Sequence, residues 1–409
     1  MINRNMKFIA SSVVAAVLSS NTVFAAGFEK SIPWSGKYAG QGNAAVSSAT
    51  GAEALYFNPA GLASSKGTEI SLNVSPTSSQ FKGPLVSNDT TLDGARTLSP
   101  IFGALASYSV NEQLSVGVGA YVGAGANARY ESVAGTGGTA DVIKTEITSL
   151  EYSVGLGYTL MPGLKLGAAW RYSAVSGNFF TLSPTNAAHI KLSDLKGSNS
   201  KGYRFGLQYA PENSNWGVGV SYRSAVDFSL DGGLSATVLS TGAAVPSSGT
   251  ASTASTQLPE AISIGGHYDL NSEMTAALEY VWTHYGKVQN IVLGGTVGGT
   301  DLTDLNVSYN NQTNIRAGFN WHPAGDWVWR AGYVYTSQVT PANRALATLT
   351  PPGVAHSFTL GTSKVLTSSM DLNAAAEYSM VSGAGAAPAK TGDYSASALA
   401  LHSGVSYRF

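Results

Sequence analysis

Few residues of the chain are arranged for catalysis or metal binding. Histidines are scattered, at His189, His267, His284, His322, His356 and His402. None shows the HExxH pattern or another paired-ligand spacing. No serine has sequence neighbours that mark it as a nucleophile, although a Ser/His site formed between strands stays open. Cysteine is absent, which excludes disulfides and thiolate metal sites. We therefore expect no catalytic residue, no metal and no cofactor.

Three arginines could instead bind an anion. A guanidinium presents two parallel donors that fit a carboxylate, and Arg171, Arg204 and Arg316 each stand on the polar side of an alternating segment. Glutamates stand on the same side of such segments, namely Glu151, Glu279 and Glu377. For any one arginine we favour an ion pair with such a glutamate over a binding role.

The segments that carry these charges alternate with a period of two residues. In one clear example, Tyr152, Val154, Leu156, Tyr158 and Leu160 take one face, while small and polar residues take the other. Such alternation predicts strands of about ten residues with two different faces. The pattern recurs at 164–172, 203–209, 216–223, 262–268, 274–282, 315–321, 327–335, 372–380 and 399–409.

The placement of charge indicates what each face touches. Charged residues make up 11% of the chain, where a soluble domain carries roughly 25%, and within the alternating segments they occupy the small, polar face. The apolar face carries essentially no charge and ends in Tyr and Trp, as a lipid-facing surface with aromatic girdles does. A soluble sandwich would instead carry a face dense in Lys and Glu. We predict that the apolar face meets lipid and the polar face lines a lumen.

Other classes of protein are disfavoured by composition. The mature chain has no apolar run of ~20 residues, which a helical membrane protein would need. The net charge is −1, so no basic face for nucleic acid is expected. The aromatic content of 10% argues against a disordered chain.

The first residues predict a signal peptide over 1–25. Arg4 and Lys7 precede an apolar stretch at 8–18, and the small-residue cleavage signal ends at Ala25. A short membrane anchor is the alternative, but the apolar stretch is too short for a span. Export of a chain without cysteine suits a Gram-negative cell envelope.

The connections predict an outer membrane barrel over 68–409. Short turns at 111–113, 161–163, 211–215, 269–273, 322–326 and 366–369 alternate with longer segments at 82–96, 131–144, 183–196, 231–253, 290–303, 340–353 and 382–392. Short periplasmic turns and long outer loops are typical of outer membrane barrels, and this count predicts a transmembrane antiparallel β-barrel of about fourteen strands.

Residues 26–67 precede the first strand and show no long alternation. They are rich in Gly and Ala and contain Trp34, Tyr38, Tyr56 and Phe57. A floppy tail would be more charged and less aromatic. We therefore predict a compact plug in the lumen, since a barrel of this size would otherwise enclose a water-filled pore.

Several short motifs support a family resemblance. They are Ala26-Gly27-Phe28, the small-residue run 40–45, Asn58-Pro59-Ala60, Leu258-Pro259-Glu260 and Pro341-Ala342-Asn343-Arg344. With these motifs the whole mature chain resembles the FadL-type long-chain fatty acid transporters, which include channels for aromatic hydrocarbons. The resemblance implies passive uptake of hydrophobic small molecules through a hatch-plugged barrel. It also implies a monomer surrounded by outer membrane lipid and lipopolysaccharide.

The resemblance also assigns roles to residues of the hatch and of the third strand. It implies that Asn58, Pro59 and Ala60 lie near a lateral opening, and that Phe28 lines a pocket at the end of the hatch. The third strand, expected at about 114–130, should be kinked to form this opening. Its glycines are candidates for the kink, although glycine is common on the whole lumen face: Gly117, Gly119, Gly123 and Gly125.

Substrate capture is expected between the third and fourth outer loops. The groove candidates are Phe179, Phe180, Leu182, Ile190 and Leu192 from the third loop region, with Leu234, Val238 and Leu239 from the fourth. Exposed apolar groups of this kind mark binding sites, but the two loops could equally pack on each other. A fatty acid would need a cation such as Arg171, Arg204 or Arg316, whereas an aromatic hydrocarbon would not. A general porin and a structural or adhesive barrel stay open as alternatives.

Overall fold

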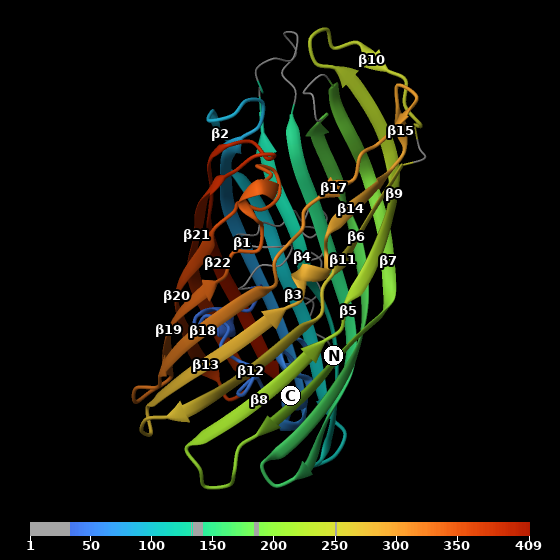
Figure 1. Cartoon of the computed structure of the whole chain (residues 1–409). Coiled ribbons are helices and arrows are strands. Elements are labelled where there is room, and N and C mark those ends of the chain that lie inside the picture. Colours follow the sequence, from blue (N-terminus) through green and yellow to red (C-terminus); the bar gives the residue numbers. More distant parts are fainter. Residues whose placement is uncertain (1–32, 132, 134–141, 184–187, 250–251) are drawn as a thin grey trace, which may run out of the picture.

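A closed antiparallel β-barrel forms the body of the molecule (Figure 1). The computed structural model describes residues 33–131, 133, 142–183, 188–249 and 252–409. Within these residues the barrel has 14 strands and closes where the last strand pairs with the first. The predicted all-β barrel is therefore confirmed. The predicted signal peptide and Phe28 lie outside the described residues.

The wall contains uninterrupted and interrupted strands. The uninterrupted strands are β1 (Thr68–Pro84), β3 (Thr97–Ser109), β4 (Leu114–Tyr130), β5 (Ile143–Met161), β6 (Leu164–Leu182), β7 (Ala188–Tyr209), β18 (Gln312–Trp321), β19 (Trp327–Thr336), β20 (Val354–Thr367), β21 (Met370–Gly385) and β22 (Gly392–Arg408). Each interrupted strand consists of two consecutive segments: β8 (Trp216–Arg223) and β9 (Val226–Val238), β11 (Ser252–Leu258) and β12 (Ala261–Asp269), and β13 (Met274–Thr283) and β14 (Asn290–Gly294).

Short strands and 3₁₀-helices lie at the outer end of the barrel. They are β2 (Thr91–Asp93), β10 (Ala244–Val245), β15 (Thr296–Val297), β16 (Thr300–Asp301), β17 (Leu305–Asn306), η2 (Tyr285–Lys287) and η3 (Ala342–Arg344). No helix among the described residues is long and apolar enough to cross a membrane.

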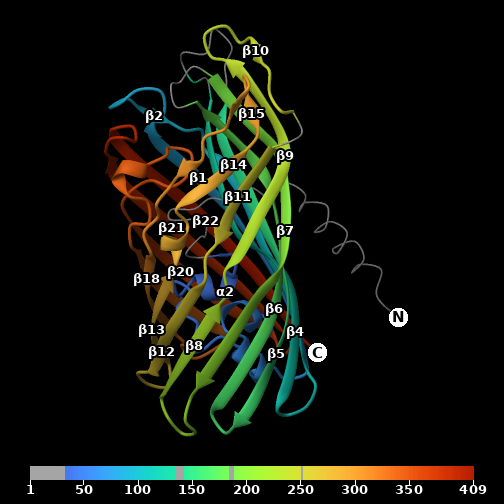
Figure 2. The ribbon, with the colours of Figure 1, turned by 45° about the vertical axis from the view of Figure 1, so that its right-hand side comes forward.

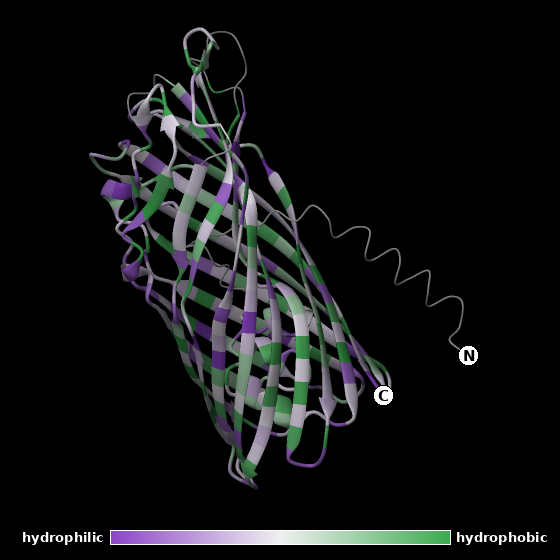
Figure 3. Ribbon diagram, turned by 90° about the vertical axis from the view of Figure 1, so that its right-hand side faces the viewer, coloured by the Kyte–Doolittle hydropathy of each residue, from purple (hydrophilic) through white to green (hydrophobic). Residues whose placement is uncertain are grey.

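The two faces of the wall follow the predicted alternation. Large apolar side chains such as Val154, Phe205 and Leu278 are exposed on the outside, whereas Glu151 and Arg171 are buried inside. Along the ribbon, hydrophobic and hydrophilic residues alternate as stripes (Figure 3). This arrangement places the apolar side chains where lipid tails would lie and the charges where they can pair.

Several predicted outer loops are in fact strands. The segments 183–196 and 231–253 contain the start of β7, the end of β9 and the start of β11. Pairs such as Ala188↔Val238 and Ser252↔Gly232 extend the sheet there, because the alternation continues beyond the lipid-facing part. At one end of the barrel the wall therefore continues as an outer extension. At the other end short turns connect neighbouring strands (Figure 1).

Residues 33–67, which precede β1, fold inside the lumen (Figure 2). We call residues 33–67 the plug segment; it contains α2 (Gly36–Ala39), α3 (Ala54–Phe57) and η1 (Pro59–Ser64). Asn58 separates α3 from η1, and its side-chain oxygen accepts from Ala60 N at 3.2 Å. Pro59 opens the following turn, where its missing N–H costs no hydrogen bond.

The wall assignment predicts a large difference between two arginine substitutions. Leu207 lies between Leu166 and Val220 on the outer face, so Leu207→Arg should destabilise the barrel by about 2–4 kcal/mol near the membrane centre. Ser235→Arg, on the exposed face of the outer extension, should change stability little. Urea unfolding and heat-modifiable gel mobility measure both. Equal stability of the two variants would contradict the assignment.

Candidate functional site

The plug segment is fixed to one side of the wall through Glu53. Its carboxylate accepts from Ser35 Oγ at 2.5 Å, from Ser71 Oγ at 2.6 Å and from Asn73 Nδ2 at 3.0 Å. The amide of Gly36 donates to Asn73 Oδ1 at 3.0 Å. The carboxylate thus joins the plug segment, from which it projects, to β1.

Glu279 of β13 fixes the other side of the plug segment. Its Oε2 accepts from the backbone N–H groups of Ala45 and Val46, both at 2.8 Å. Its Oε1 pairs with Arg316 Nη1 at 2.7 Å, and the same nitrogen donates to Asn43 O at 3.4 Å. Hydrogen bonds of this charge-assisted kind are roughly twice as strong as neutral ones, so this side of the plug segment is also firmly attached.

The side chain of Asn58 bonds the wall directly. Its Nδ2 donates to Val46 O at 2.7 Å, to Leu207 O at 3.0 Å and to Val220 O at 3.2 Å. A Cβ on Gly206 would come within 1.9 Å of Asn58 Oδ1, so any larger residue there would displace the Asn58 side chain. The side chain of Asn58 therefore contacts β7 and β8.

Pro59 and Ala60 lie against glycines of the neighbouring strands. A Cβ on Gly157 would come within 2.9 Å of Pro59 O, and one on Gly167 within 2.2 Å of Ala60 N. Bare backbone on β5 and β6 thus lets η1 pack directly on the wall.

An aromatic cluster joins the plug segment to β4. Tyr121 of β4 lies 5.7 Å from Trp34 and 5.0 Å from Tyr56, measured between ring centroids. Phe57 lies 5.0 Å from Tyr56 and 4.8 Å from Tyr38, both edge-on. Edge-to-face contacts are favourable between aromatic rings. The sequence had indicated aromatic packing in this segment, but not its partner on β4.

A buried charge cluster lies beside these rings. Arg171 Nη2 pairs with Glu151 Oε2 at 2.5 Å, and Tyr121 Oη donates to Oε1 of the same carboxylate. Arg204 lies farther from Glu151, at 3.9 Å, and stands 4.8 Å from the ring centroid of Tyr56. Of the three candidate arginines, Arg171 and Arg316 therefore hold a carboxylate closely and Arg204 holds one only loosely.

Arg204 also lines a small lumen cavity of about 80 Å³ beside the first described residue of the plug segment. Arg223 and Arg316 contribute two more cations, and Glu279 contributes an anion. The other lining residues mix aromatic, polar and small groups: Pro33, Asn43, Tyr56, Phe57, Ser221, Ala261, Ser263, Val281, Thr283, Gln312 and Asn314. The cavity therefore offers more positive than negative charge beside two aromatic rings.

The third strand leaves its neighbour partway along the wall. β4 pairs with β3 from Ser109↔Ser115 to Gly103↔Tyr121 and no farther, while β3 goes on pairing with β1 up to Thr97. On its other side β4 stays paired with β5, with a bulge at Gly123 between Val122 and Ala124. Bulges bend a strand.

Above this bulge β4 turns inward. Most of its residues from Tyr121 to Tyr130 are buried, so this part is covered on both faces. Asn127 Nδ2 donates to Ser99 Oγ at 3.0 Å, and the amide of Ala95 donates to Arg129 O at 2.7 Å. These scattered contacts replace the regular ladder between β3 and β4.

The four glycines of this strand occupy different environments. Gly123 lies at the bulge, and Gly125 lies above it, opposite Thr148. Gly117 and Gly119 lie below it, where a Cβ would come within 2.8 Å of Leu62 and 2.9 Å of Leu105. Close packing therefore accounts for the two lower glycines without a kink.

The groove candidates lie on strands of the outer extension, apart from Leu239, which follows β9. Phe179, Leu192 and Leu234 are buried in one apolar cluster that also contains Ala124 of the inward-turned part of β4, and Ile190 packs against it. Leu182 packs against a second cluster around Tyr130 and Tyr394.

The remaining groove candidates are less central. Phe180 lies 4.8 Å from Lys144 and 5.9 Å from Lys191, measured from the ring centroid to Nζ. Val238 is half-buried, and Leu239 is buried. Part of the predicted groove is thus a buried apolar cluster and not an open cleft.

A Ser–His–Glu arrangement escaped the sequence analysis. Ser75 Oγ lies 2.8 Å from His402 Nδ1, and His402 Nε2 lies 3.1 Å from Glu377 Oε2. Ser75 Oγ also donates to Trp34 O at 2.9 Å, and all three side chains are buried. Because the hydroxyl proton is engaged by the plug segment, we interpret the trio as an attachment of the plug segment to β1, β21 and β22. Glu377 thus has His402 as a partner.

Metal binding has no basis in the described part of the chain, where no group of three or more His, Cys, Asp or Glu side chains could hold an ion.

Comparisons with known proteins agree with this architecture. A family model described as outer membrane protein transport protein (OMPP1/FadL/TodX) matches residues 14–409. The structure of a Pseudomonas aeruginosa FadL homologue is similar with a TM-score of 0.76 and 18% identity, covering 94% of this chain and 100% of that one. No curated protein sequence matches the chain.

Two transporters of known structure are also similar. The Pseudomonas putida toluene transporter TodX has a TM-score of 0.74 at 17% identity, covering 95% of this chain and 100% of its own. The Ralstonia pickettii toluene transporter TbuX has a TM-score of 0.67 at 16% identity, covering 93% and 99%. At these identities the likeness concerns the fold.

The buried Glu151–Arg171 pair predicts a costly single substitution. Glu151→Gln leaves the guanidinium buried without its anion, so the barrel should lose about 3–5 kcal/mol of stability. The double variant Glu151→Gln/Arg171→Gln should recover much of this loss. Asp93→Asn, which breaks the exposed Lys82–Asp93 pair, is the control and should cost at most about 1 kcal/mol. Urea unfolding measures all three, and a Glu151→Gln loss no larger than the control's would contradict the interpretation.

Proposed function

Since the chain belongs to the outer membrane transport family OMPP1/FadL/TodX, we propose that it admits hydrophobic small molecules passively and releases them sideways through the barrel wall. In this proposal the barrel acts as a monomer within outer membrane lipid and lipopolysaccharide. Lipopolysaccharide resists hydrophobic solutes and a polar porin lumen rejects them. A lateral exit lets such a solute reach lipid without crossing water.

The attachment of the plug segment argues against axial exit. Glu53, Glu279 and Asn58 hold it on several sides of the wall, as described above. Freeing it would leave Glu53 and Glu279 without most of their buried donors, and such losses are expensive. A solute that enters from outside therefore needs another way out.

The observation that carries the proposal is the break between β3 and β4. The ladder ends at Gly103↔Tyr121, and Tyr121 itself packs on Trp34 and Tyr56 of the plug segment. The wall thus loses its regular β3–β4 ladder at the level where the lumen is filled. We propose that Gly123 and Gly125 allow the bend and that solute passes between residues 97–102 and 122–130.

The apolar interior of the outer extension supports an entry route. Phe179, Leu192 and Leu234 share one cluster with Ala124, which lies just above the bulge. A hydrophobic solute that separates these side chains would move along apolar surface toward the break. Capture by Phe180, Leu182, Ile190, Val238 and Leu239 belongs to the same proposal.

The hatch residues keep a gating role in this proposal. Asn58, Pro59 and Ala60 set the position of η1 against β5, β6 and β7, so that movement of η1 would alter the packing beside β4. Phe28 would contribute from the chain that precedes Pro33 and its cavity.

For the substrate we propose a long-chain fatty acid, with an aromatic hydrocarbon as the alternative. Arg204 supports the fatty acid, because it lines the cavity and its contact with Glu151 is long, at 3.9 Å. Arg223 and Arg316 add positive charge to the same cavity. The TodX and TbuX structures, whose proteins are toluene transporters, are the reason to keep the alternative.

Proteoliposomes separate this function from the porin alternative. Liposomes that carry the barrel should take up oleate or toluene faster than glucose, whereas a general porin would pass the sugar rapidly. A purely structural or adhesive barrel would transport none of the three.

Closing the break should stop transport. In the double variant Ser99→Cys/Asn127→Cys, a short bifunctional thiol reagent would tether β3 to β4, since the native side chains lie 3.0 Å apart. Oleate or toluene uptake should fall to the level of empty liposomes. The control Ser357→Cys/Ser379→Cys tethers β20 to β21, which are already paired, and should transport normally. Unchanged uptake in the first tethered barrel would contradict lateral exit.

The two substrate classes can be separated at Arg204. Arg204→Gln removes a charge-assisted bond to a carboxylate, so oleate should bind about tenfold more weakly. Toluene binding should stay within about twofold, because a neutral ring makes no such bond. Binding titrations with both ligands on purified protein measure this. Equal effects on both ligands would contradict a carboxylate role for Arg204.

A further inference from the structure

The lipid-facing side of the wall has a hollow near its periplasmic rim. Pairing aligns Thr362, Ala374 and Ser403 in one lateral row across β20, β21 and β22. These side chains are small. Leu360 and Leu401 flank them on one side, and Lys364, Leu372 and Val405 flank them on the other. Together with Phe319, Trp321, Trp329, Leu360 and Leu401, they line a hollow of about 650 Å³.

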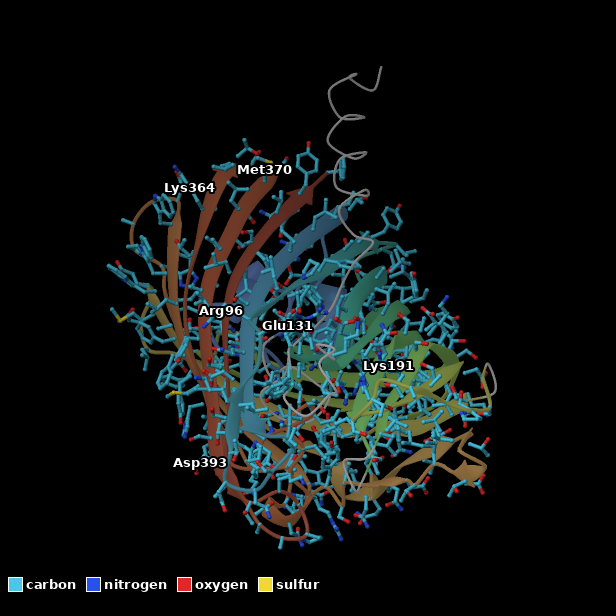
Figure 4. All side chains as sticks on the ribbon, turned by 90° about the horizontal axis from the view of Figure 1, so that it is seen from above. Arg96, Glu131, Lys191, Lys364, Met370 and Asp393 are labelled. Atoms are coloured by element: carbon cyan, nitrogen blue, oxygen red, sulfur yellow. The ribbon has the colours of Figure 1, made fainter. Side chains whose placement is uncertain are left out.

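A cation and two tryptophans stand at the edge of this hollow. Trp329 pairs with Thr362, and Trp327 pairs with Lys364 one row nearer the rim. Trp327 and Trp329 stack at 5.8 Å with an interplanar angle of 12°. The ammonium of Lys364 lies 4.9 Å from the ring centroid of Trp327. Viewed from above, Lys364 and Met370 lie at the outer edge of the barrel (Figure 4).

The position of the cation relative to the membrane identifies the ligand. The short turns of β18–β19 and β20–β21 lie next to Lys364 and mark the periplasmic side. In that leaflet phosphate groups lie at the level of the rim and acyl chains lie beyond it. Lys364 lies at the rim. The hollow begins about two residues, or roughly 7 Å, farther along β20 toward the membrane centre.

We infer that this hollow binds one phospholipid of the periplasmic leaflet, with an acyl chain along Thr362, Ala374 and Ser403 and its phosphate at Lys364. Apolar burial alone would not hold it, because lipid tails surround the whole barrel. The gain comes from the fit of the chain beside the small side chains and from the attraction between Lys364 and the phosphate. The site is independent of the transport route.

A second hollow supplies the matched comparison. It has a similar size, about 690 Å³, and lies over Gly266 and Ala276 beside Trp216 and Tyr268. Its described lining includes no lysine or arginine. Both hollows have an apolar surface. Lys364 stands one row from the first, whereas the turns beside the second, at 211–215, 269–273 and 322–326, contain no lysine or arginine. A comparison of the two therefore separates general lipid contact from a specific phospholipid site.

Native mass spectrometry of the full-length protein in mild detergent tests the inference, with dioleoyl phosphatidylglycerol as the added lipid. The unaltered protein should retain one molecule. Lys364→Gln should lower its occupancy about fivefold, and Ala374→Phe, which fills the hollow, should lower it at least as far. Ala276→Phe, which fills the comparison hollow, should leave it unchanged. Dioleoylglycerol has no phosphate. Its occupancy on the unaltered protein should therefore be as low as the occupancy of phosphatidylglycerol on Lys364→Gln.

Two results would overturn the inference. One is equal phosphatidylglycerol occupancy in the unaltered protein, Lys364→Gln and Ala374→Phe, each shown to be folded by heat-modifiable mobility. The other is a dimer that Ala374→Phe converts to a monomer without loss of bound lipid, since the hollow would then be an interface between two copies. Oleate uptake by Ala374→Phe should be normal, which keeps this test separate from the transport proposal.

Discussion

The structure depends on the need to satisfy every backbone N–H and C=O group inside a membrane. A closed sheet meets this need because each strand bonds both neighbours, and the β1–β22 pairing removes the last free edge. The upper part of β4 departs from this rule, since it has lost its ladder with β3. The departure is tolerated because this part turns inward, where protein rather than lipid covers it.

The same constraint explains the composition of the lumen. A plug that fills a barrel must approach the strands closely, and glycine and other small residues on the inner face allow this contact. Gly206 admits the side chain of Asn58, and Gly167 admits the backbone of Ala60. The few charges that remain, such as Glu279 and Glu151, hold the plug segment or an arginine. The low charge content thus follows from a lumen that is packed rather than solvated.

The sequence predicted the architecture because its main signal is local. Period-two alternation reports the two faces of each strand, and the expected third strand coincides with β4. The length of the segments between the alternating stretches predicted loops in the outer extension, whereas β7 and β9 continue to pair there. Glu377 and His402 lie on the consecutive strands β21 and β22. Ser75 could not be joined to them from the sequence, because only barrel closure brings β1 beside β22. For the same reason neither the partners of Asn58 nor the separate environments of Gly117 and Gly123 were predictable.

The central claim is that solute leaves through the wall between β3 and β4. The most direct measurement is photo-crosslinking of a diazirine-labelled fatty acid during uptake into proteoliposomes, followed by mapping of the labelled peptides. Lateral exit predicts label on residues 97–102 and 122–130. Label on the periplasmic side of the plug segment, without label at the break, would contradict the account.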